Sequence, residues 1–126
     1  STVSIFNAIH IIDFHREWCH LGLIKPQDFN VNILQSPDWY RIDVLPPEFK
    51  DQIRTRVTEH LEWLEPFDKL TRATNGYKGV ITFLNQQDNS QHLADFFNLN
   101  DLIDSVRSEK FEEVFPEYQD LKSFIK

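Results

Sequence analysis

The clearest pattern along the chain is a run of apolar residues spaced three or four apart between positions 46 and 64. Its members are Phe49, Ile53, Val57, Leu61 and Leu64. This spacing places them on one face of an α-helix. Pro46 and Pro47 precede the run and suit the first turn of a helix, and Pro66 follows it. The pattern predicts a long amphipathic helix that ends near Glu65.

Three shorter patterns near the N-terminus are typical of strands. Residues 3–9 open with alternating β-branched positions, residues 30–34 form a second apolar run, and residues 40–44 alternate cleanly. In the last of these, Arg41 and Asp43 face away from the apolar positions, which predicts a half-buried strand with both charges on its outer side.

Several further segments have the spacing of short helices. Residues 9–23 are one of them, and Gly22 suits its end. The others are predicted at residues 67–73, 78–85, 88–97 and 100–107. Breaks are predicted at 74–76 and 98–100, because Asn and Gly disfavour helix interiors. The tail over residues 118–125 is amphipathic.

Strands early and helices later predict an α+β fold. We expect a helix-rich single domain over residues 1–126, with two or three N-terminal strands followed by a small helical bundle. Residues 1–45 form the strand-helix-strand part and residues 46–126 the helical part. The chain carries 11 Phe, 3 Trp and 3 Tyr, and such side chains supply large buried areas for one core.

Charge narrows the classes of partner. The net charge is −7 and the pI is near 5.1, and no basic block is present, which disfavours nucleic acids and anionic membranes. No apolar run reaches the length of a membrane span, and the N-terminus lacks the charged region of a signal peptide. With one cysteine, no internal disulfide can form. These features predict a cytoplasmic protein.

The residues most suited to hold a metal lie on the 9–23 helix. His15 and Cys19, four apart, lie about 40° from each other around the helix axis and share a face. His10 and His20 each lie about 140° from His15, so neither joins it. A zinc site needs three or four ligands, so His15 and Cys19 are weak metal candidates, and packed or exposed side chains are the stronger interpretation. His60 sits at the edge of an apolar stripe, which predicts a packed histidine.

The order of several short segments is similar to that of a known family. These are Thr2–Asn7 before a helix, Asn32–Leu34, Pro37–Tyr40, the Val44–Lys50 run VLPPEFK, and the closing element Ile103–Glu117. Together they cover most of the chain. The sequence resembles the C-terminal region of twitch-type radical S-adenosylmethionine proteins, a group frequent in phages and marine bacteria. The resemblance implies that the opening strand is a remnant of a partial β/α barrel and that the rest is an extension beside it.

The chain departs from that family in its cysteines. The family's chemistry needs a CxxxCxxC loop to hold an iron–sulfur cluster, and only Cys19 is present here. No catalytic residue can be carried over, and no cofactor is expected. The resemblance therefore implies a fragment or truncated relative of a radical enzyme, acting as a non-catalytic helical domain that braces or covers a neighbouring barrel.

Two other functions fit the same sequence. One is a stand-alone protein-interaction module, of phage origin, that binds through an exposed aromatic patch. The other is a small enzyme or metal protein that uses His15, Cys19 and a distant histidine, which a stoichiometric metal would reveal.

A barrel remnant leaves strand edges open. We therefore expect binding to a neighbouring protein domain or self-association, as a two-fold dimer that buries residues 3–9. Three polar positions, Asn7, Arg41 and Arg107, are the first to inspect, and Arg107 is expected to pair with Asp104.

Overall fold

The computed structural model describes the chain except for residues 37–39, 87–88, 108–112, 114, 119 and 125–126. Over the described part it is a helix-rich α+β domain, as predicted. The helices and strands are β1 (Thr2–Val3), α1 (Ile11–His20), β2 (Asn32–Ile33), α2 (Pro47–Leu64), α3 (Arg72–Gln86) and α4 (Leu93–Arg107). Short 3-10 helices lie at Pro26–Asp28, Ile42–Val44, Ser90–His92, Pro116–Tyr118 and Leu121–Phe124.

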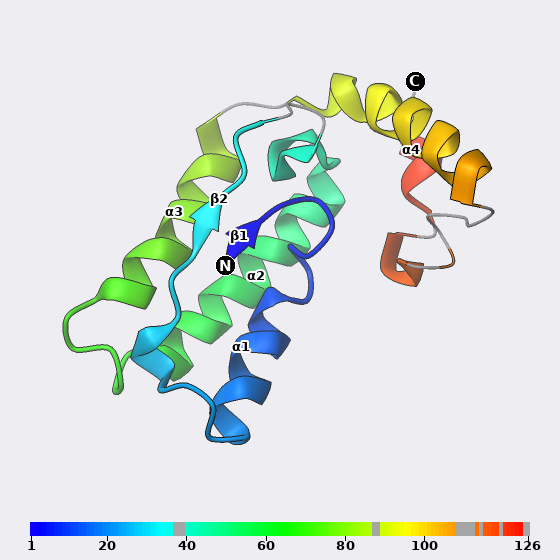
Figure 1. The fold of residues 1–126 in the computed structure, drawn as a ribbon. Helices are drawn as coiled ribbons and strands as arrows, with labels where there is room; N and C mark the ends of the chain where they lie inside the picture. The colour runs from blue at the N-terminus through cyan, green and yellow to red at the C-terminus, as the bar shows by residue number, and fades with distance from the viewer. Residues whose placement is uncertain (37–39, 87–88, 108–112, 114, 119, 125–126) are drawn as a thin grey trace.

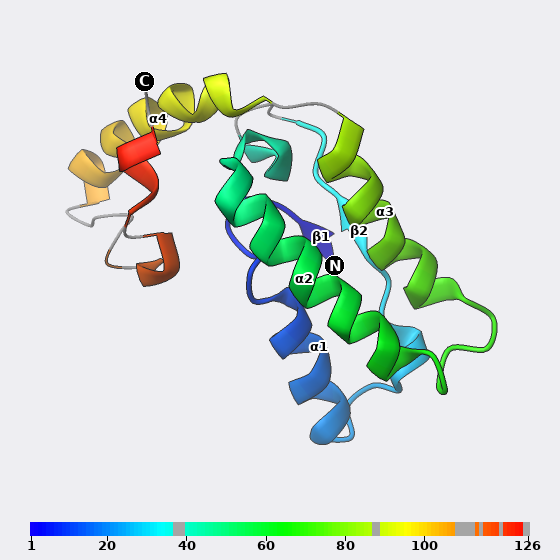
Figure 2. The same cartoon turned by 180° about the vertical axis from the view of Figure 1, so that it is seen from behind.

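Helix α2 lies at the centre of the arrangement. Helix α3 packs along it in the opposite direction, α1 lies beside it, and β2 runs along α3 (Figures 1 and 2). Helix α4 extends away from this group, and the C-terminal 3-10 helices lie beneath it. The long helix predicted from the 46–64 pattern is confirmed, since α2 begins at Pro47 and ends at Leu64. Leu64, at its C-terminal end, is fully buried.

The sheet is smaller than predicted. Strands β1 and β2 pair in parallel, with Thr2 opposite Asn32 and Val3 opposite Ile33. The predicted 3–9 strand therefore ends at Val3, and turns over residues 5–10 lead into α1. The predicted 30–34 strand is confirmed with shorter bounds.

The side chain of Asn7 closes the outer edge of β1. Its Oδ1 accepts from the backbone N–H of Ser4 at 2.9 Å, and its Nδ2 donates to the carbonyl of Thr2 at 2.9 Å. These two backbone groups point away from β2 and would pair with a third strand in a larger sheet. One amide side chain thus replaces a neighbouring strand over this short edge.

The predicted strand at 40–44 is wrong: the segment forms a 3-10 helix at Ile42–Val44. Asp43 does not face solvent but is only 1% exposed. Its Oδ2 accepts from Arg41 Nη2 and from Asn89 Nδ2, each at 2.7 Å, and its backbone carbonyl accepts from the N–H of Asn89. A buried carboxylate needs such partners, and they hold the segment in a compact turn where a strand would have placed both charges outside.

Helix α3 runs without a break through the predicted interruption at 74–76. Gly76 sits where the helix meets the chain just before β2. A Cβ built on Gly76 would lie 3.0 Å from both Cβ and the carbonyl oxygen of Val31. The glycine is thus required by close packing of a helix on an extended segment, and the usual cost of glycine in a helix is offset by that contact.

Two residues that precede α3 shape its start: Asp68 is buried and caps the helix, and Thr71 has a strained backbone. The carboxylate of Asp68, nearly fully buried, accepts from the backbone N–H of Arg72 at 3.2 Å and of Thr74 at 2.7 Å. This is the capping that the free N–H groups of a first helical turn require. Thr71 precedes the helix with a φ of 56°, a left-handed value that is strained for a β-branched residue.

The other predicted helix ends also meet local chemistry. Helix α1 has shorter bounds than the predicted 9–23, and Gly22 follows it with a φ of 76°, as its predicted stopping role requires. Helix α4 continues through the predicted break at 98–100. Its Asn100 side chain donates to the carbonyl of Phe96 at 2.8 Å, so this polar residue is satisfied within the helix.

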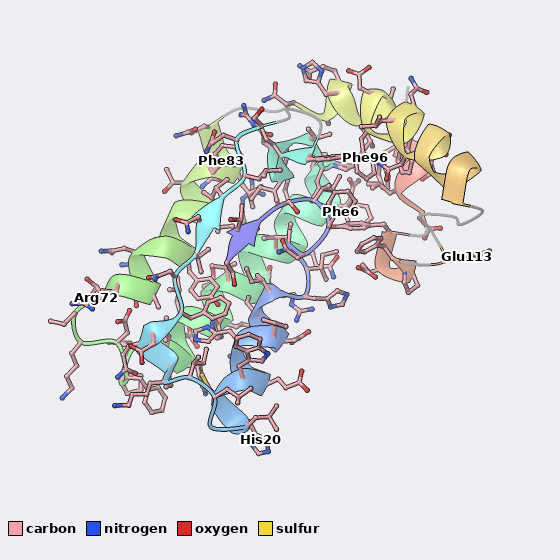
Figure 3. The ribbon with its side chains drawn as sticks, viewed as in Figure 1. Phe6, His20, Arg72, Phe83, Phe96 and Glu113 are labelled. Atoms are coloured by element: carbon pink, nitrogen blue, oxygen red, sulfur yellow. The ribbon has the colours of Figure 1, made fainter. Side chains whose placement is uncertain are left out.

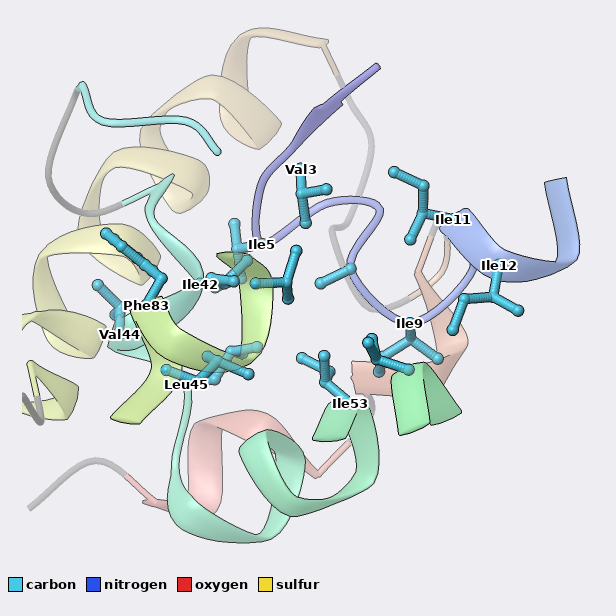
Figure 4. Close-up of a cluster of buried hydrophobic side chains, with 14 of the residues drawn as sticks. Val3, Ile5, Ile9, Ile11, Ile12, Ile42, Val44, Leu45, Ile53 and Phe83 are labelled. Atoms are coloured by element: carbon cyan, nitrogen blue, oxygen red, sulfur yellow. The ribbon is translucent and has the colours of Figure 1, made fainter. Parts of the chain in front are cut away.

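One apolar core covers the N-terminal segment. Val3, Ile5 and Ile9 are buried against α2 and the 42–45 segment (Figure 4). We predicted that a second copy would bury residues 3–9, but Val3, Ile5 and Ile9 are already buried within the chain itself. Phe6 points toward α4, where its ring lies 5.8 Å from that of Phe96 (Figure 3). Ring contacts of this kind join α4 to the rest of the domain.

One prediction falls outside the described residues. It is the pairing of Arg107 with Asp104, whose side chains are not described.

Candidate functional site

The three central helices each contribute one polar ring to a buried cluster. His15 of α1, His60 of α2 and Tyr77 of α3 are all fully buried. His15 Nδ1 lies 2.7 Å from the hydroxyl of Tyr77 and 2.9 Å from His60 Nε2. His15 Nε2 lies 2.8 Å from the carbonyl oxygen of Pro26. Three helices and the 26–28 turn therefore meet at one imidazole.

The partners fix the tautomer of both histidines. A carbonyl oxygen only accepts, so His15 Nε2 carries the hydrogen and donates to Pro26. The single lone pair of His15 Nδ1 is then shared between two donors, the Tyr77 hydroxyl and the N–H of His60 Nε2. His60 Nδ1 is left as an acceptor, and Arg16 Nε donates to it at 3.0 Å. Every ring nitrogen has a partner while both histidines are neutral.

Burial also keeps these rings neutral. It lowers the pKa of His15, with the nearby Arg16 acting in the same direction and the bond to Pro26 opposing them. Burial lowers the pKa of His60 to about 3, with further contributions from His15 and Arg16. Burial raises the pKa of Tyr77, so its hydroxyl keeps its proton. Low-dielectric surroundings disfavour every charged form here.

Aromatic rings enclose the cluster. Phe29 stacks on His15 with ring centroids 4.2 Å apart, and Trp63 stacks on His60 at 5.1 Å. The guanidinium of Arg16 lies 5.1 Å from the centroid of Trp63, a cation–π contact that covers the outer side. A general base must reach the proton that it removes from a substrate, and these histidines have no exposed atoms. The geometry suits a role in holding α1, α2 and α3 together.

The candidate metal residues are placed differently from a metal site. Both ring nitrogens of His15 are engaged, and Cys19 is half-buried with its thiol pKa raised by burial. Over the described part of the chain, no three His, Cys, Asp or Glu side chains are grouped to hold a metal ion. His10, the residue before α1, and His20, its last residue, are both exposed.

His60 is packed, as predicted, but its contact with His15 was not foreseen. The two residues are 45 positions apart, and no sequence pattern links α1 to α2. The one available signal was that His15 and His60 each lie beside apolar positions of their helices.

The exposed side of α1 is the other feature with functional potential. Phe14 is 43% exposed, Trp18 37% and Leu21 61%, and their positions i, i+4 and i+7 place them on one stripe. The rings of Phe14 and Trp18 are 4.5 Å apart. We call Phe14, Trp18 and Leu21 the α1 stripe. Large apolar side chains gathered on one exposed face indicate a binding surface more often than scattered ones do.

A pocket adjoins the N-terminal end of the α1 stripe. It has a volume of about 360 Å³ and is lined by Ser1, Thr2, Asn7, His10, Ile11 and Phe14. One of these lining residues, His10, has its Nε2 3.2 Å from Glu117 Oε1. Further along α1, Asp13 Oδ2 lies 2.7 Å from Arg56 Nη2. These pairs tie α1 to α2 and to the C-terminal part of the chain.

Comparison with known proteins finds no matching protein family, no similar curated protein and no similar solved structure. Among the helices that the structure describes, each is too short or too polar to cross a membrane.

Two of the three polar positions singled out in the sequence have structural roles. Asn7 closes the edge of β1, and Arg41 pairs with Asp43 while its guanidinium lies 5.0 Å from the ring centroid of Phe83. The side chain of Arg107 is outside the described set.

Proposed function

We propose that this chain is a non-catalytic helical domain that packs against a neighbouring protein domain through the α1 stripe. The observation that carries the proposal is the exposure of Phe14, Trp18 and Leu21 on one helix face. The same helix buries its other side in the core through Ile11, Ile12 and His15. A helix that is apolar on both its inner and outer sides fits a site where a second protein surface covers the outer one.

A non-catalytic role is also supported by the buried cluster. Of the residues with shifted pKa values, the candidates for acid–base catalysis are His15, His60 and Tyr77. All three are buried and neutral, and they are hydrogen-bonded to one another. Strongly shifted pKa values point to function when the groups lie in a cleft. Here they lie in the core, where hydrogen bonds between helices stabilise the fold.

The resemblance to twitch-type radical S-adenosylmethionine proteins supplies the neighbour. Under this proposal the domain is a relative of their C-terminal extension, in the cytoplasm, and the α1 stripe lies against the barrel that holds the cluster. The lone Cys19, with a raised pKa, supports an extension that leaves the iron chemistry to that neighbour.

The first test is the reading frame that precedes Ser1 in the gene. A segment with a CxxxCxxC loop supports the proposal. That segment and this chain should then co-purify when expressed as separate polypeptides. Trp18→Asp should abolish the co-purification, while Gln52→Asp, on an exposed position of α2, should leave it intact. Co-purification that does not depend on Trp18 would contradict the docking face.

A second test concerns chemistry. The isolated chain, treated anaerobically with iron and sulfide, should take up no four-iron cluster, because it has one cysteine where such clusters need several thiolates. A stoichiometric cluster ligated by the chain would overturn the non-catalytic assignment.

The alternative is a stand-alone interaction module, of phage origin, that uses the same face to bind another protein or a second copy of itself. The exposed aromatic pair Phe14 and Trp18 favours it equally. A preceding reading frame without the cysteine loop would select this alternative, and sedimentation measurements would show whether the chain forms a dimer.

A further inference from the structure

The α1 stripe has the spacing by which one helix recognises another. Phe14, Trp18 and Leu21 follow the i, i+4, i+7 positions that anchor helix-in-groove contacts. The stripe runs along α1 from Phe14 to Leu21, the helical residue that caps its C-terminal end, and ridges of side chains on one helix pack into the grooves of another. The adjoining pocket of about 360 Å³, lined in part by Phe14, offers a place for one large apolar side chain at the end of the ridge.

The charges beside the stripe select the chemistry of that second helix. Around the axis of α1, Glu17 lies about 60° from Phe14 and Asp13 about 100°, both on the same side. On the opposite side Ile11 and His15 are buried in the core. The open flank of the stripe therefore carries two carboxylates, and the His10 ring and the Arg56 guanidinium lie beside that of Asp13.

The two acidic residues differ in their existing partners. Asp13 already pairs with Arg56 at 2.7 Å. Glu17 is exposed, and no ion pair to it occurs among the residues that the structure describes. Glu17 is thus the carboxylate available to a basic side chain from outside.

We propose that the α1 stripe binds an amphipathic helix of a partner protein, with apolar residues on the stripe and Lys or Arg beside Glu17. This proposal rests on the proposed function and names the chemistry of the partner surface. The chain as a whole carries a net charge of −7, so long-range attraction also favours a basic partner.

A second copy of this chain fits the stripe less well. An antiparallel two-fold pairing of α1 with itself would bring Glu17 against Glu17, between two molecules that each carry −7.

An anionic membrane fits less well for the same reason. Helices that lie on such membranes carry Lys or Arg on the flank of the apolar face. Here that flank carries Asp13 and Glu17.

The test uses two synthetic amphipathic peptides with the same leucine face, one with lysine and one with glutamate on its polar face. Binding to the full chain is measured by fluorescence anisotropy of the labelled peptide. We expect the lysine peptide to bind at least about tenfold more tightly than the glutamate peptide. Trp18→Ser should weaken binding by about thirtyfold, as for the central side chain of an interface. Phe14→Ser, at the neighbouring position, should act in the same direction.

A matched pair of charge reversals separates the local from the overall effect. Glu17→Lys should weaken binding of the lysine peptide by about five- to tenfold. Asp95→Lys changes the net charge equally on α4, where Asp95 is 59% exposed, and should have a much smaller effect. Circular dichroism confirms that each variant is folded.

Each contrary result has a distinct meaning. Equal binding of both peptides, or equal effects of Glu17→Lys and Asp95→Lys, overturns the basic-helix proposal. Dimerisation that Trp18→Ser abolishes assigns the stripe to a second copy, and binding to anionic phosphatidylserine vesicles in preference to both peptides assigns it to a membrane. If the lysine peptide fails to bind while co-purification with the preceding segment depends on Trp18, the docking face stands and the partner chemistry is wrong. If both fail, the proposed function fails too.

Discussion

Lowering the pH from about 7 to about 5 should destabilise this protein through its buried histidines. In the unfolded chain a histidine binds a proton near pH 6.5. In the folded protein His60 has a pKa of about 3 and the pKa of His15 is also lowered. The unfolded state therefore binds more protons than the folded state as the pH falls below 6.5, and acid favours unfolding.

The magnitude follows from the width of that pH window. Each pH unit below about 6.5 and above the folded pKa of about 3 removes about 1.4 kcal/mol of the stability that His60 contributes. For His60 this amounts to about 2 kcal/mol at pH 5. His15 adds to the loss in the same direction. The contribution is fully present above the unfolded pKa and is lost as the pH falls toward the folded one. Small domains have only about 5–15 kcal/mol of stability, so the loss is measurable.

The groups around His60 act against each other to a limited extent. Burial, His15 and Arg16 lower its pKa, while Asp13 raises it. Burial, His15 and Arg16 together outweigh Asp13, so the balance stays in favour of the neutral ring.

Urea unfolding, followed by tryptophan fluorescence at pH 7, 6 and 5, measures the effect. The control compares His60→Gln, which cannot titrate, with His20→Gln, which removes an exposed histidine. The loss of stability between pH 7 and 5 should shrink by about 2 kcal/mol in His60→Gln and stay unchanged in His20→Gln. The reasoning is refuted if wild type and His60→Gln lose the same amount, or if acid stabilises the wild type over this interval.

Three further predictions concern backbone contacts, each measured by urea unfolding unless stated. Gly76→Ala should destabilise the fold by about 1–3 kcal/mol, because its Cβ would lie 3.0 Å from Val31. Gly79→Ala, whose Cβ would meet nothing within 4 Å, should stabilise the fold by up to about 1 kcal/mol. The same sign for both would refute the packing argument. Asn7→Ala should cost about 1–3 kcal/mol by leaving two edge groups without their partner, and amide exchange at Ser4 should speed up; unchanged exchange would count against the edge closure. Asp68→Ala should cost about 1–2 kcal/mol by removing two bonds at the start of α3, and an unchanged midpoint would show that solvent replaces the cap.

The parts of the fold that local patterns determine could be predicted from the sequence. Helix α2 has an apolar stripe and prolines at both ends, so its face and bounds follow from residues close together in the chain. The end of α1 follows equally from Gly22, since few other residues adopt its φ of 76°.

The errors arise where a distant residue overrides local preference. Gly76 looks like a helix breaker until Val31 is known to press against it. The 40–44 segment alternates like a strand, but Asp43 finds Asn89 and is buried in a turn. Neither partner lies within the span that a periodic pattern covers, so propensity alone favoured the wrong state.

The cluster of His15, His60 and Tyr77 could not be predicted for the same reason: its members are far apart in the sequence. His15 and Cys19 drew attention because they share a helix face, whereas the contact that forms joins His15 to His60 and Tyr77 on two other helices. The exposed α1 stripe was not predicted either, because the sequence does not tell which apolar residues of α1 the core covers.

The two neighbouring glycines of α3 have a consequence for recognising kin of this protein. In descendants of the same ancestor that keep α3 against Val31, selection should favour glycine at position 76, whereas drift at position 79 meets no steric barrier. Unequal variation at these two positions is therefore the evolutionary trace that this packing should leave.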